Sequence, residues 1–331
     1  MAVRRTGVWP IVVIAGACVV IASPLLLAVA AIISLLDRGR QRPLRLVALI
    51  TAYCAYELAA MARGVWLWLR GGFGRALTSG DSVARHYELV RWFLDGMRRA
   101  AARTTAFELQ IDGASREAGE FLARNEAPAL ILARHAGAGD SFLIVQELLS
   151  RYGRRPRVVM KSTLQYDPLI DLFGNRVPNC FIDPNTHDAE AAIASLARGL
   201  GRHEALLIFP EGGNFSLARR RRAIAHLVAL GRRATARKAM RLHHVAPPKL
   251  GGVLAALEAS PDADIVLIAH AGLADASGPG AFWRSIPLDR PARMCLWLVR
   301  RSEVPDAESE VGDWLMGWWR RLDARVGAGG V

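Results

Sequence analysis

The sequence predicts an α/β fold: a layered domain with a largely parallel mixed sheet flanked by helices, preceded by N-terminal membrane helices. Short apolar runs of strand length alternate with amphipathic segments of helix length over most of the chain, which is typical of α/β proteins. Before them, two apolar stretches are long enough to cross a bilayer. We therefore expect a membrane anchor at residues 1–70 and an α/β domain at 71–331.

The composition excludes several classes of protein. Of the 331 residues, 52% are hydrophobic and 22% are charged, so the chain is too apolar to be intrinsically disordered. Four cysteines are ordinary usage for a chain of this length, which excludes a small disulfide scaffold. They form no C-x-x-C motif, so we expect a reducing compartment and no cysteine-based metal site. His243 and His244 are adjacent and have no carboxylate at ligand spacing, so we expect no metal.

The first apolar stretch has no charged residue between Arg5 and Asp37. A cleaved signal peptide is the alternative, but its apolar core would be about half as long. The second stretch, 46–69, contains Glu57 and Arg63 and ends in a tryptophan-rich segment typical of a membrane interface. It is either a second span or an amphipathic helix in one leaflet. The anchor is therefore one span or a two-helix re-entrant element.

Short apolar runs predict the strands, and the segments between or after them predict helices. The expected strands are 128–133, 157–160, 179–182, 205–209, 264–269 and 294–299. The helices include 141–151, 189–200 and 306–325. Because parallel sheets carry their chemistry at the carboxyl ends of the strands, the residues that follow each run are the candidates for function.

The first run is followed by an H-x-x-x-x-D motif, in which glycines turn the chain between His135 and Asp140. Asp140 would cap the next helix, and its carboxylate would fix the imidazole tautomer so that the other ring nitrogen acts as a general base. A second match, His270 to Asp275, continues into a loop rather than a helix, which favours the first. A structural histidine at residue 135 is the competing interpretation. The turn lacks the third glycine of G-x-G-x-x-G, which excludes a dinucleotide site.

The fourth run ends in F-P-E-G, formed by Phe209, Pro210, Glu211 and Gly212. A carboxylate held between proline and glycine would hydrogen-bond a substrate hydroxyl or orient a basic group. The alternative is an acid at a helix N-terminus that interacts with the helix dipole. No G-x-S-x-G motif is present, which argues against a serine hydrolase of that type.

The two motifs together, about seventy residues apart, resemble the glycerophospholipid acyltransferase family, typified by lysophosphatidic acid acyltransferases. The similarity covers roughly residues 130–271. Lys161, with the Leu, Pro and Gly that follow it, is similar to a further family pattern, and 244–249 is similar to an apolar-Pro-apolar block. The resemblance implies a membrane-bound O-acyltransferase that moves a fatty acyl chain from acyl-CoA or acyl carrier protein to a hydroxyl of a lysophospholipid or related lipid. No bound cofactor is implied, because the acyl donor is a substrate.

The resemblance also implies roles for individual residues. His135 would be the general base, assisted by Asp140, and backbone N–H groups of Gly137 and Gly139 would stabilise the oxyanion. The substrate-binding residues would be Lys161, Phe209, Pro210, Glu211 and Gly212. Glu211 would position the polar part of the acceptor, and Lys161 would contact an anionic head group.

Two residues depart from the family pattern: Pro184 and Asn214 stand where the family has arginines that hold the acceptor phosphate. The candidates to replace these arginines, as contacts for phosphate or coenzyme A, are Arg219, Arg220, Arg221 and Arg222. The head group of the acceptor therefore stays open. A second hypothesis is a catalytically silent or differently specific member of the same fold that binds anionic lipid.

The segment 216–241 is rich in arginine, and the chain carries a net charge of +13. A solvated helix, a nucleic-acid-binding surface and a surface for anionic lipid or coenzyme A all fit this charge. With a membrane anchor present we favour membrane lipids as partners and expect no nucleic acid. Because acyl-CoA is found in the cytoplasm, the resemblance places the active site at the cytoplasmic side of the cytoplasmic membrane.

Overall fold

The computed structural model describes residues 4–36, 40–137, 139–183, 189–272 and 279–328. The chain forms two compact units. Unit 1 comprises Met1–Glu108, Met160–Phe181 and Gly278–Pro291, and unit 2 comprises Leu109–Val159, Ile182–Ser277 and Ala292–Val331.

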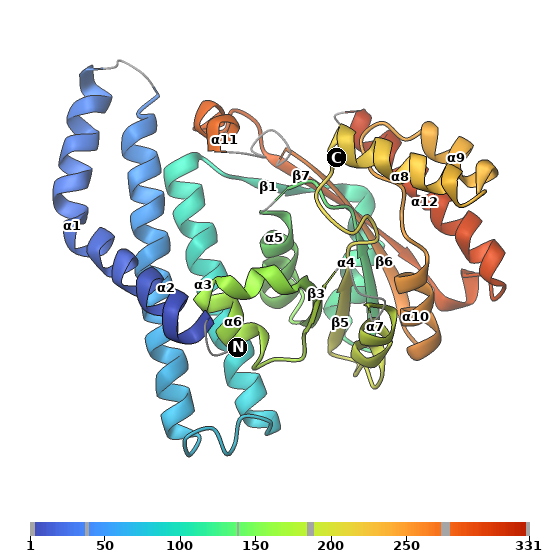
Figure 1. The fold of residues 1–331 in the computed structure, drawn as a ribbon, viewed down its shortest axis with the longest axis horizontal. Helices are drawn as coiled ribbons and strands as arrows, with labels where there is room; N and C mark the ends of the chain where they lie inside the picture. Colours follow the sequence, from blue (N-terminus) through green and yellow to red (C-terminus); the bar gives the residue numbers. More distant parts are fainter. Residues whose placement is uncertain (1–3, 37–39, 138, 184–188, 273–278, 329–331) are drawn as a thin grey trace. The chain divides into compact units, whose positions relative to one another are not determined.

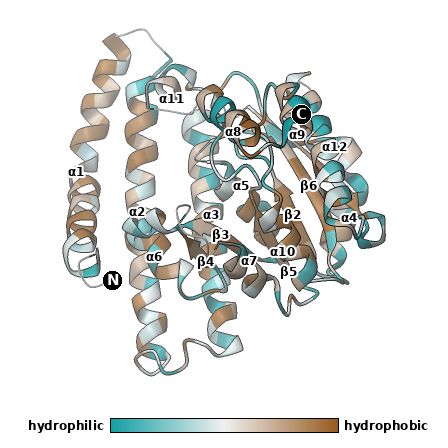
Figure 2. Ribbon diagram, turned by 45° about the vertical axis from the view of Figure 1, so that its right-hand side comes forward, coloured by the Kyte–Doolittle hydropathy of each residue, from teal (hydrophilic) through white to brown (hydrophobic). Residues whose placement is uncertain are grey.

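Unit 1 is built on three long helices, α1 (Trp9–Leu36), α2 (Arg42–Arg70) and α3 (Gly80–Thr105). A π-helical turn, Arg4–Val8, precedes α1. The helices α1 and α2 pack side by side (Figure 1) and are long and apolar enough to cross a membrane. Little of either is buried, and Figure 2 shows α1 in the colours of apolar residues along most of its length. Both coincide with the predicted apolar stretches.

Shorter elements complete unit 1. They are the 3-10 turn Ser162–Tyr166, α6 (Pro168–Gly174) and α11 (Pro279–Ser285). Asp167 caps α6 by accepting a hydrogen bond from the N–H of Ile170, and the Tyr53 hydroxyl of α2 donates to the same carboxylate at 3.1 Å. Asp171 of α6 pairs with Arg5 at 2.9 Å. These polar contacts hold α6 against the long helices.

Seven strands form one sheet, in the order β1-β7-β6-β2-β5-β3-β4. The strands are β1 (Leu109–Ile111), β2 (Ala129–Ala133), β3 (Arg155–Lys161), β4 (Cys180–Ile182), β5 (Glu204–Ile208), β6 (Asp264–Ala271) and β7 (Ala292–Val299). Strand β2 runs parallel to both β5 and β6, and β5 runs parallel to β3. The direction reverses between β6 and β7, and β1 is parallel to β7. The predicted fold class, a largely parallel mixed sheet with flanking helices, is confirmed.

The helices of unit 2 alternate with these strands. They are α4 (Arg116–Arg124), α5 (Asp140–Gln146) with a π-helical turn Glu147–Arg151, α7 (Ala189–Ala197), α8 (Leu217–Ala229), α9 (Arg233–Met240), α10 (Gly251–Ala259) and α12 (Glu308–Gly327). Short 3-10 turns lie at Gly113–Ser115 and Arg301–Glu303. Helix α4 packs on β7, α12 on β6, and α10 on α7.

The core of unit 2 lies around the central strand. Every residue of β2 is at most 1% exposed, and Ala205–Leu207 of β5 are fully buried. Strands covered on both faces read as continuous apolar runs, which is why the sequence pattern identifies them. Each predicted strand is present within a few residues of its expected ends, whereas β1 is an additional strand that the sequence did not predict.

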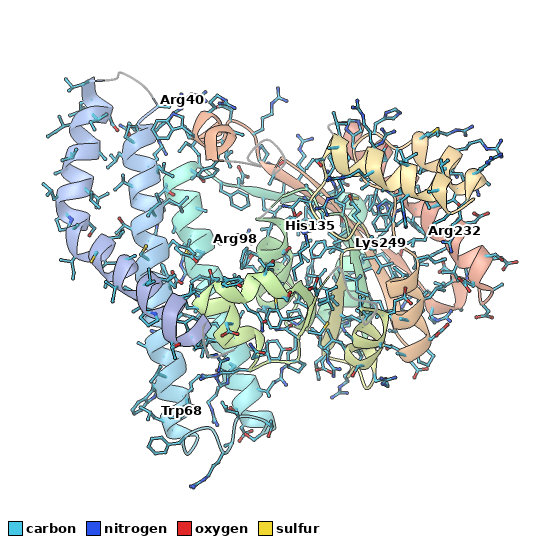
Figure 3. All side chains as sticks on the ribbon, viewed as in Figure 1. Arg40, Trp68, Arg98, His135, Arg232 and Lys249 are labelled. Carbon is cyan, nitrogen blue, oxygen red and sulfur yellow. The ribbon has the colours of Figure 1, made fainter. Side chains whose placement is uncertain are left out.

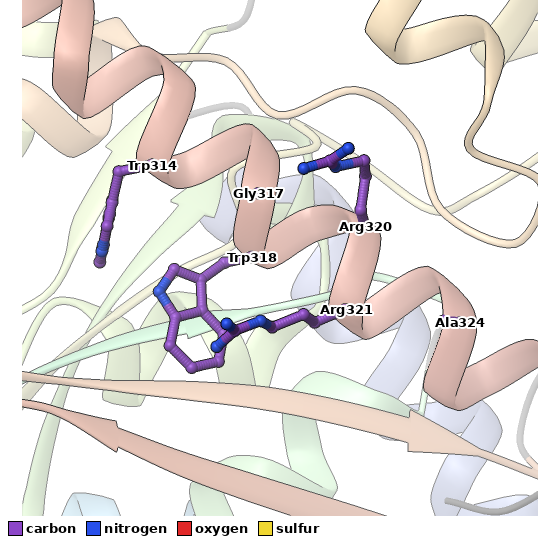
Figure 4. Close-up of a pocket in the computed structure, with 6 residues that line it drawn as sticks. All are labelled: Trp314, Gly317, Trp318, Arg320, Arg321 and Ala324. Atoms are coloured by element: carbon purple, nitrogen blue, oxygen red, sulfur yellow. The ribbon is translucent and has the colours of Figure 1, made fainter.

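A hollow of about 430 Å³ lies along α12 (Figure 4). Its lining is formed by Trp314, Gly317, Trp318, Arg320, Arg321 and Ala324. The Arg321 guanidinium lies 4.6 Å from the centroid of the Trp318 ring, a cation–π contact, and Trp319 is fully buried. Trp319 therefore belongs to the core of unit 2, whereas Trp314 and Trp318 are partly exposed.

Candidate active site

The sheet topology brings three candidate segments to one edge. Because β2 lies between β5 and β6 and runs parallel to both, the carboxyl ends of the three strands meet. His135 follows β2, Glu211 follows β5, and His270 is the last residue but one of β6. The register pairs Ala133 with Ile268, so His270 lies level with the turn that follows β2.

His135 and Asp140 contact each other across the turn. Both carboxylate oxygens of Asp140 lie 3.0 Å from His135 Nδ1. The Asp140 side chain is completely buried, whereas 17% of the His135 side chain is exposed. The pair therefore joins a buried carboxylate to an imidazole that reaches the surface, the arrangement expected for an oriented general base.

Asp140 is held as an anion by its surroundings. Its carboxylate accepts hydrogen bonds from the backbone N–H groups of Ala136 at 2.6 Å, Gly137 at 3.1 Å and Ser141 at 2.7 Å. Burial by itself would raise the pKa of Asp140, but hydrogen bonds from His135 and His270 outweigh it and keep that pKa well below its usual range. The carboxylate thus favours a proton on Nδ1 of His135 and leaves Nε2 as the basic nitrogen.

The two candidate oxyanion donors differ. The buried N–H of Gly137 donates to Asp140, so it stabilises the carboxylate and is not directed at a substrate. Gly139 is exposed and stands at the N-terminal cap of α5. The oxyanion role of Gly139 stays a prediction, and Ala138 between the two glycines lies outside the described residues.

Glu211 connects two backbone segments. Oε1 accepts the N–H of His135 at 3.1 Å, and Oε2 accepts the N–H of Ala246 at 2.8 Å. The side chain is only 4% exposed, and this burial raises its pKa to about 7 although the two hydrogen bonds and Arg134 act in the opposite direction. Helix α8 begins six residues later, at Leu217, so Glu211 is no helix N-terminal acid. It holds the backbone of His135 in place.

The other residues of F-P-E-G continue from β5 beside His135. The rings of Phe209 and His135 stack with centroids 4.4 Å apart and an interplanar angle of 29°. The N–H of Gly212 donates to the carbonyl of Phe209 at 2.9 Å, and Gly212 has a φ of +70°, which L-residues with side chains rarely adopt. The N–H of Phe215 donates to the carbonyl of His135 at 2.7 Å. Phe209, buried Pro210, Glu211 and Gly212 thus form one wall of the site.

Three buried polar residues that the sequence analysis did not assign support this arrangement. Arg134 is 2% exposed and donates to the carbonyls of His270 at 2.6 Å and His244 at 3.0 Å. Asp323 of α12 accepts the N–H groups of His243 at 2.8 Å and Val245 at 3.1 Å. His270 lies beside Asp140, with Nε2 3.5 Å from Oδ2. Strand pairing and helix packing bring them together, so their contacts could not be predicted from a local motif.

The remaining predicted residues are placed as follows. Lys161 is the last residue of β3 and belongs to unit 1, so its contact with a head group stays a prediction. Of the four arginines, Arg219 donates to the carbonyl of Gly212 at 3.2 Å, whereas Arg220 donates to the carbonyl of Met240 at 2.7 Å. Arg221 and Arg222 are exposed on α8, as is Asn214 before it. Pro184 and Asp275 lie outside the described residues.

No set of three or more His, Cys, Asp or Glu side chains that could hold a metal ion is found in the parts of the chain that the structure describes.

Comparison with known proteins identifies this region. Residues 116–271 match the sequence model of the family described as Acyltransferase. A comparison with curated proteins found no match. The matched range begins with the first residue of α4 and ends with the last residue of β6, so it contains all three strand ends that meet at the site. Residues 116–271 of this chain belong to the Acyltransferase family, the glycerophospholipid acyltransferase family that the two sequence motifs indicate.

Proposed function

We propose that the protein is a membrane-bound O-acyltransferase that moves a fatty acyl chain from a thioester donor, acyl-CoA or acyl carrier protein, to the hydroxyl of a lysophospholipid or related lipid. The observation that carries this proposal is the His135–Asp140 pair at the carboxyl end of β2, inside the acyltransferase-family domain. Its carboxylate is buried and its imidazole is partly exposed, so a substrate can reach the base and solvent cannot surround the acid.

In the proposed reaction His135 Nε2 removes the proton of the acceptor hydroxyl as its oxygen bonds to the thioester carbonyl carbon. The tetrahedral intermediate collapses, the C–S bond breaks, and the proton passes from His135 to the leaving thiolate. Asp140 stabilises the imidazolium that exists between these steps. General-base help of this kind contributes about 10²- to 10⁴-fold. The backbone N–H of Gly139, an exposed residue, is the proposed oxyanion donor.

Membrane attachment is part of the proposal and is supported by two features, each within one unit. In unit 1, α1 and α2 are apolar and mostly exposed. In unit 2, none of the residues of α8 is buried, and nine basic residues with no acidic one lie between residues 217 and 241. Basic surfaces of this kind are attracted to anionic leaflets. We propose the cytoplasmic side of the membrane, where acyl-CoA is found.

The decisive experiment compares His135→Ala with the wild type. Purified full-length protein is incubated with acyl-CoA and a panel of lysophospholipids, and the products are identified by mass spectrometry. We expect the variant to lose at least about 100-fold in rate while its thermal melting is kept. His203→Ala, an exposed histidine of the same unit, is the matched control. Full activity in His135→Ala would contradict the mechanism.

The second candidate is a silent or differently specific protein that binds anionic lipid. The observation in its favour is Asn214, which stands on an exposed part of the F-P-E-G loop where the family arginine is missing. A wild-type protein that transfers no acyl chain from any donor of the panel, yet binds anionic vesicles, would favour this candidate.

A further inference from the structure

Lys249 lies next to the F-P-E-G turn although it follows it by 37 residues in the sequence. Its N–H donates to the carbonyl of Pro210 at 2.8 Å, and two hydrogen bonds further along the same segments connect Ala246 to Glu211 and Glu211 to His135. Figure 3 labels Lys249 and His135 in the same region of unit 2. Position 249 is therefore attached directly to the wall of the candidate active site.

The side chain of Lys249 extends across Gly212. A Cβ atom built on Gly212 would lie 3.2 Å from both Cε and Nζ of Lys249. The absence of a side chain at residue 212 thus leaves room for the lysine stem, whose side chain is exposed. The ammonium group stands over the backbone of the turn and faces solvent.

Arg219 occupies the neighbouring position of the same turn. Its Nη1 donates to the carbonyl of Gly212 at 3.2 Å, and a Cβ atom built on Gly213 would collide with the guanidinium. Two consecutive glycines therefore accommodate two cations, one against each residue. Over the described residues neither Lys249 nor Arg219 forms an ion pair with a carboxylate, in contrast to Lys238, which pairs with Asp313 at 2.6 Å.

We infer that Lys249 and Arg219 together form a binding site for a phosphate group of a substrate at the Gly212–Gly213 turn. A phosphate monoester carries nearly two negative charges at neutral pH, which matches two cations that have no carboxylate partner. Arginine binds phosphate through a planar pair of donors, and lysine binds it as a point charge. This inference rests on the proposed function, because it assigns a substrate group to the same turn.

Two substrates carry such a group: a phosphate-bearing lysolipid acceptor and the coenzyme A donor. Full-length protein in detergent is titrated separately with coenzyme A and with lysophosphatidate, and monoacylglycerol serves as the uncharged acceptor. The variants are Lys249→Ala, Lys249→Arg and Arg219→Ala. Arg116→Ala and Arg124→Ala are matched controls, because both remove an exposed cation of α4 in the same unit, outside the basic segment 216–241.

Loss of one charge-assisted contact predicts about tenfold to hundredfold weaker binding. The site binds the acceptor phosphate if Lys249→Ala and Arg219→Ala weaken the binding of lysophosphatidate. The binding of coenzyme A and monoacylglycerol should then be unaffected. Weaker coenzyme A binding alone assigns it to the donor. Lys249→Arg should keep most of the affinity in either case. Should Arg219→Ala fail to fold, the exposed Lys249 side chain still provides the test.

Unchanged affinity for both phosphate ligands in Lys249→Ala would overturn the inference, as would an equal loss in the two control variants. A failure of this inference can be distinguished from a failure of the proposed function. A wild type that transfers acyl chains while Lys249→Ala binds normally refutes only the phosphate site. A wild type that binds lysophosphatidate through Lys249 but transfers nothing refutes the acyltransferase proposal and leaves the site intact.

Discussion

Nε2 of His270 lies 3.5 Å from Oδ2 of Asp140, so the carboxylate that contacts His135 has a second imidazole beside it. The same Nε2 lies 3.1 Å from the carbonyl oxygen of Arg134. Both neighbours are acceptors, which requires the proton of His270 to be on Nε2. Its Nδ1 has no hydrogen-bond partner in the described structure, and the side chain is 1% exposed. His270 is therefore a positioning residue for Asp140.

His270→Ala should reduce kcat about tenfold to hundredfold, because the carboxylate of Asp140 loses the N–H group that lies 3.5 Å from it. The KM values of donor and acceptor should change little, since His270 is buried away from substrate. His270→Gln, which keeps an N–H donor near the Nε2 position, should recover part of kcat. Steady-state kinetics of the wild type and the two variants gives kcat and KM, and thermal melts check that the three proteins are equally stable. Identical kinetics for the alanine and glutamine variants would show that His270 contributes packing only.

Asp140→Asn tests the anion directly. The amide nitrogen would face N–H donors that now bind a carboxylate, and the imidazole would lose the partner that fixes its tautomer. An amide in place of an orienting carboxylate costs up to about 10⁴-fold in kcat in a well-studied triad, and we expect a loss of about 10³- to 10⁴-fold here. Each unsatisfied buried donor adds about 1–3 kcal/mol of destabilisation.

The measurement for Asp140→Asn combines the rate of acyl transfer with the melting temperature. Asp313→Asn, which changes an exposed carboxylate of α12, is the control and should affect neither strongly. A fully active Asp140→Asn protein would mean that the 3.0 Å contact with His135 does not orient a base.

The local part of the site could be predicted from the sequence. Asp140 follows His135 by five residues and is the first residue of a helix. A turn this short allows the backbone few conformations, so the two side chains are expected to lie close together. Strand β2 is equally local, because burial on both faces requires an uninterrupted apolar run. By contrast, β1 has only three residues, and the middle one is exposed. A pattern this short does not distinguish a strand from a loop.

Long-range partners could not be predicted in the same way. In the sequence, His270 has only a spacing match to Asp275, which is disfavoured there, whereas the register of β6 against β2 brings His270 close to Asp140. Lys249 depends on a backbone hydrogen bond to Pro210. Strand register and loop pairing depend on contacts between segments distant in the chain, so a local pattern does not contain them.

The raised pKa of Glu211 predicts a pH dependence of stability. In the folded protein its pKa rises from the ordinary 4.5 to about 7, mainly because of burial. Between these values the folded state holds a proton that the unfolded chain releases. The free energy of unfolding therefore falls by up to about 3 kcal/mol as the pH rises from 4.5 to 7. Above pH 7 it levels off.

Glu211→Gln has no carboxyl to ionise, so its melting temperature relative to the wild type should increase between pH 5 and pH 8. The amide also loses one acceptor for the N–H groups of His135 and Ala246, but this cost is the same at every pH. Thermal melts across the pH range measure the difference. Glu310→Gln, an exposed residue of α12, is the control. If the difference in melting temperature between Glu211→Gln and the wild type does not change with pH, the raised pKa of Glu211 is contradicted.

The basic surface of α8 and α9 predicts a contact with anionic lipid. Leu217, Val228, Leu230 and Met240 are between 45% and 59% exposed, beside arginines such as Arg221 and Arg222 that point to solvent. In anionic nanodiscs, hydrogen exchange of 217–240 should be slower than in neutral ones, and high salt should remove the difference because it screens charge. Each basic residue near such a surface contributes about 1 kcal/mol.

The double variant Arg221→Gln/Arg222→Gln should therefore weaken the protection of α8 and α9 by more than tenfold in anionic nanodiscs and leave exchange in neutral nanodiscs unchanged. Arg116→Gln, which neutralises an arginine of α4 that is 86% exposed, is the matched control and should keep the protection. Equal exchange in both lipids for the wild type would exclude the contact. Protection that survives in the double variant and at high salt would mean that the apolar residues, not the arginines, hold this surface at the bilayer.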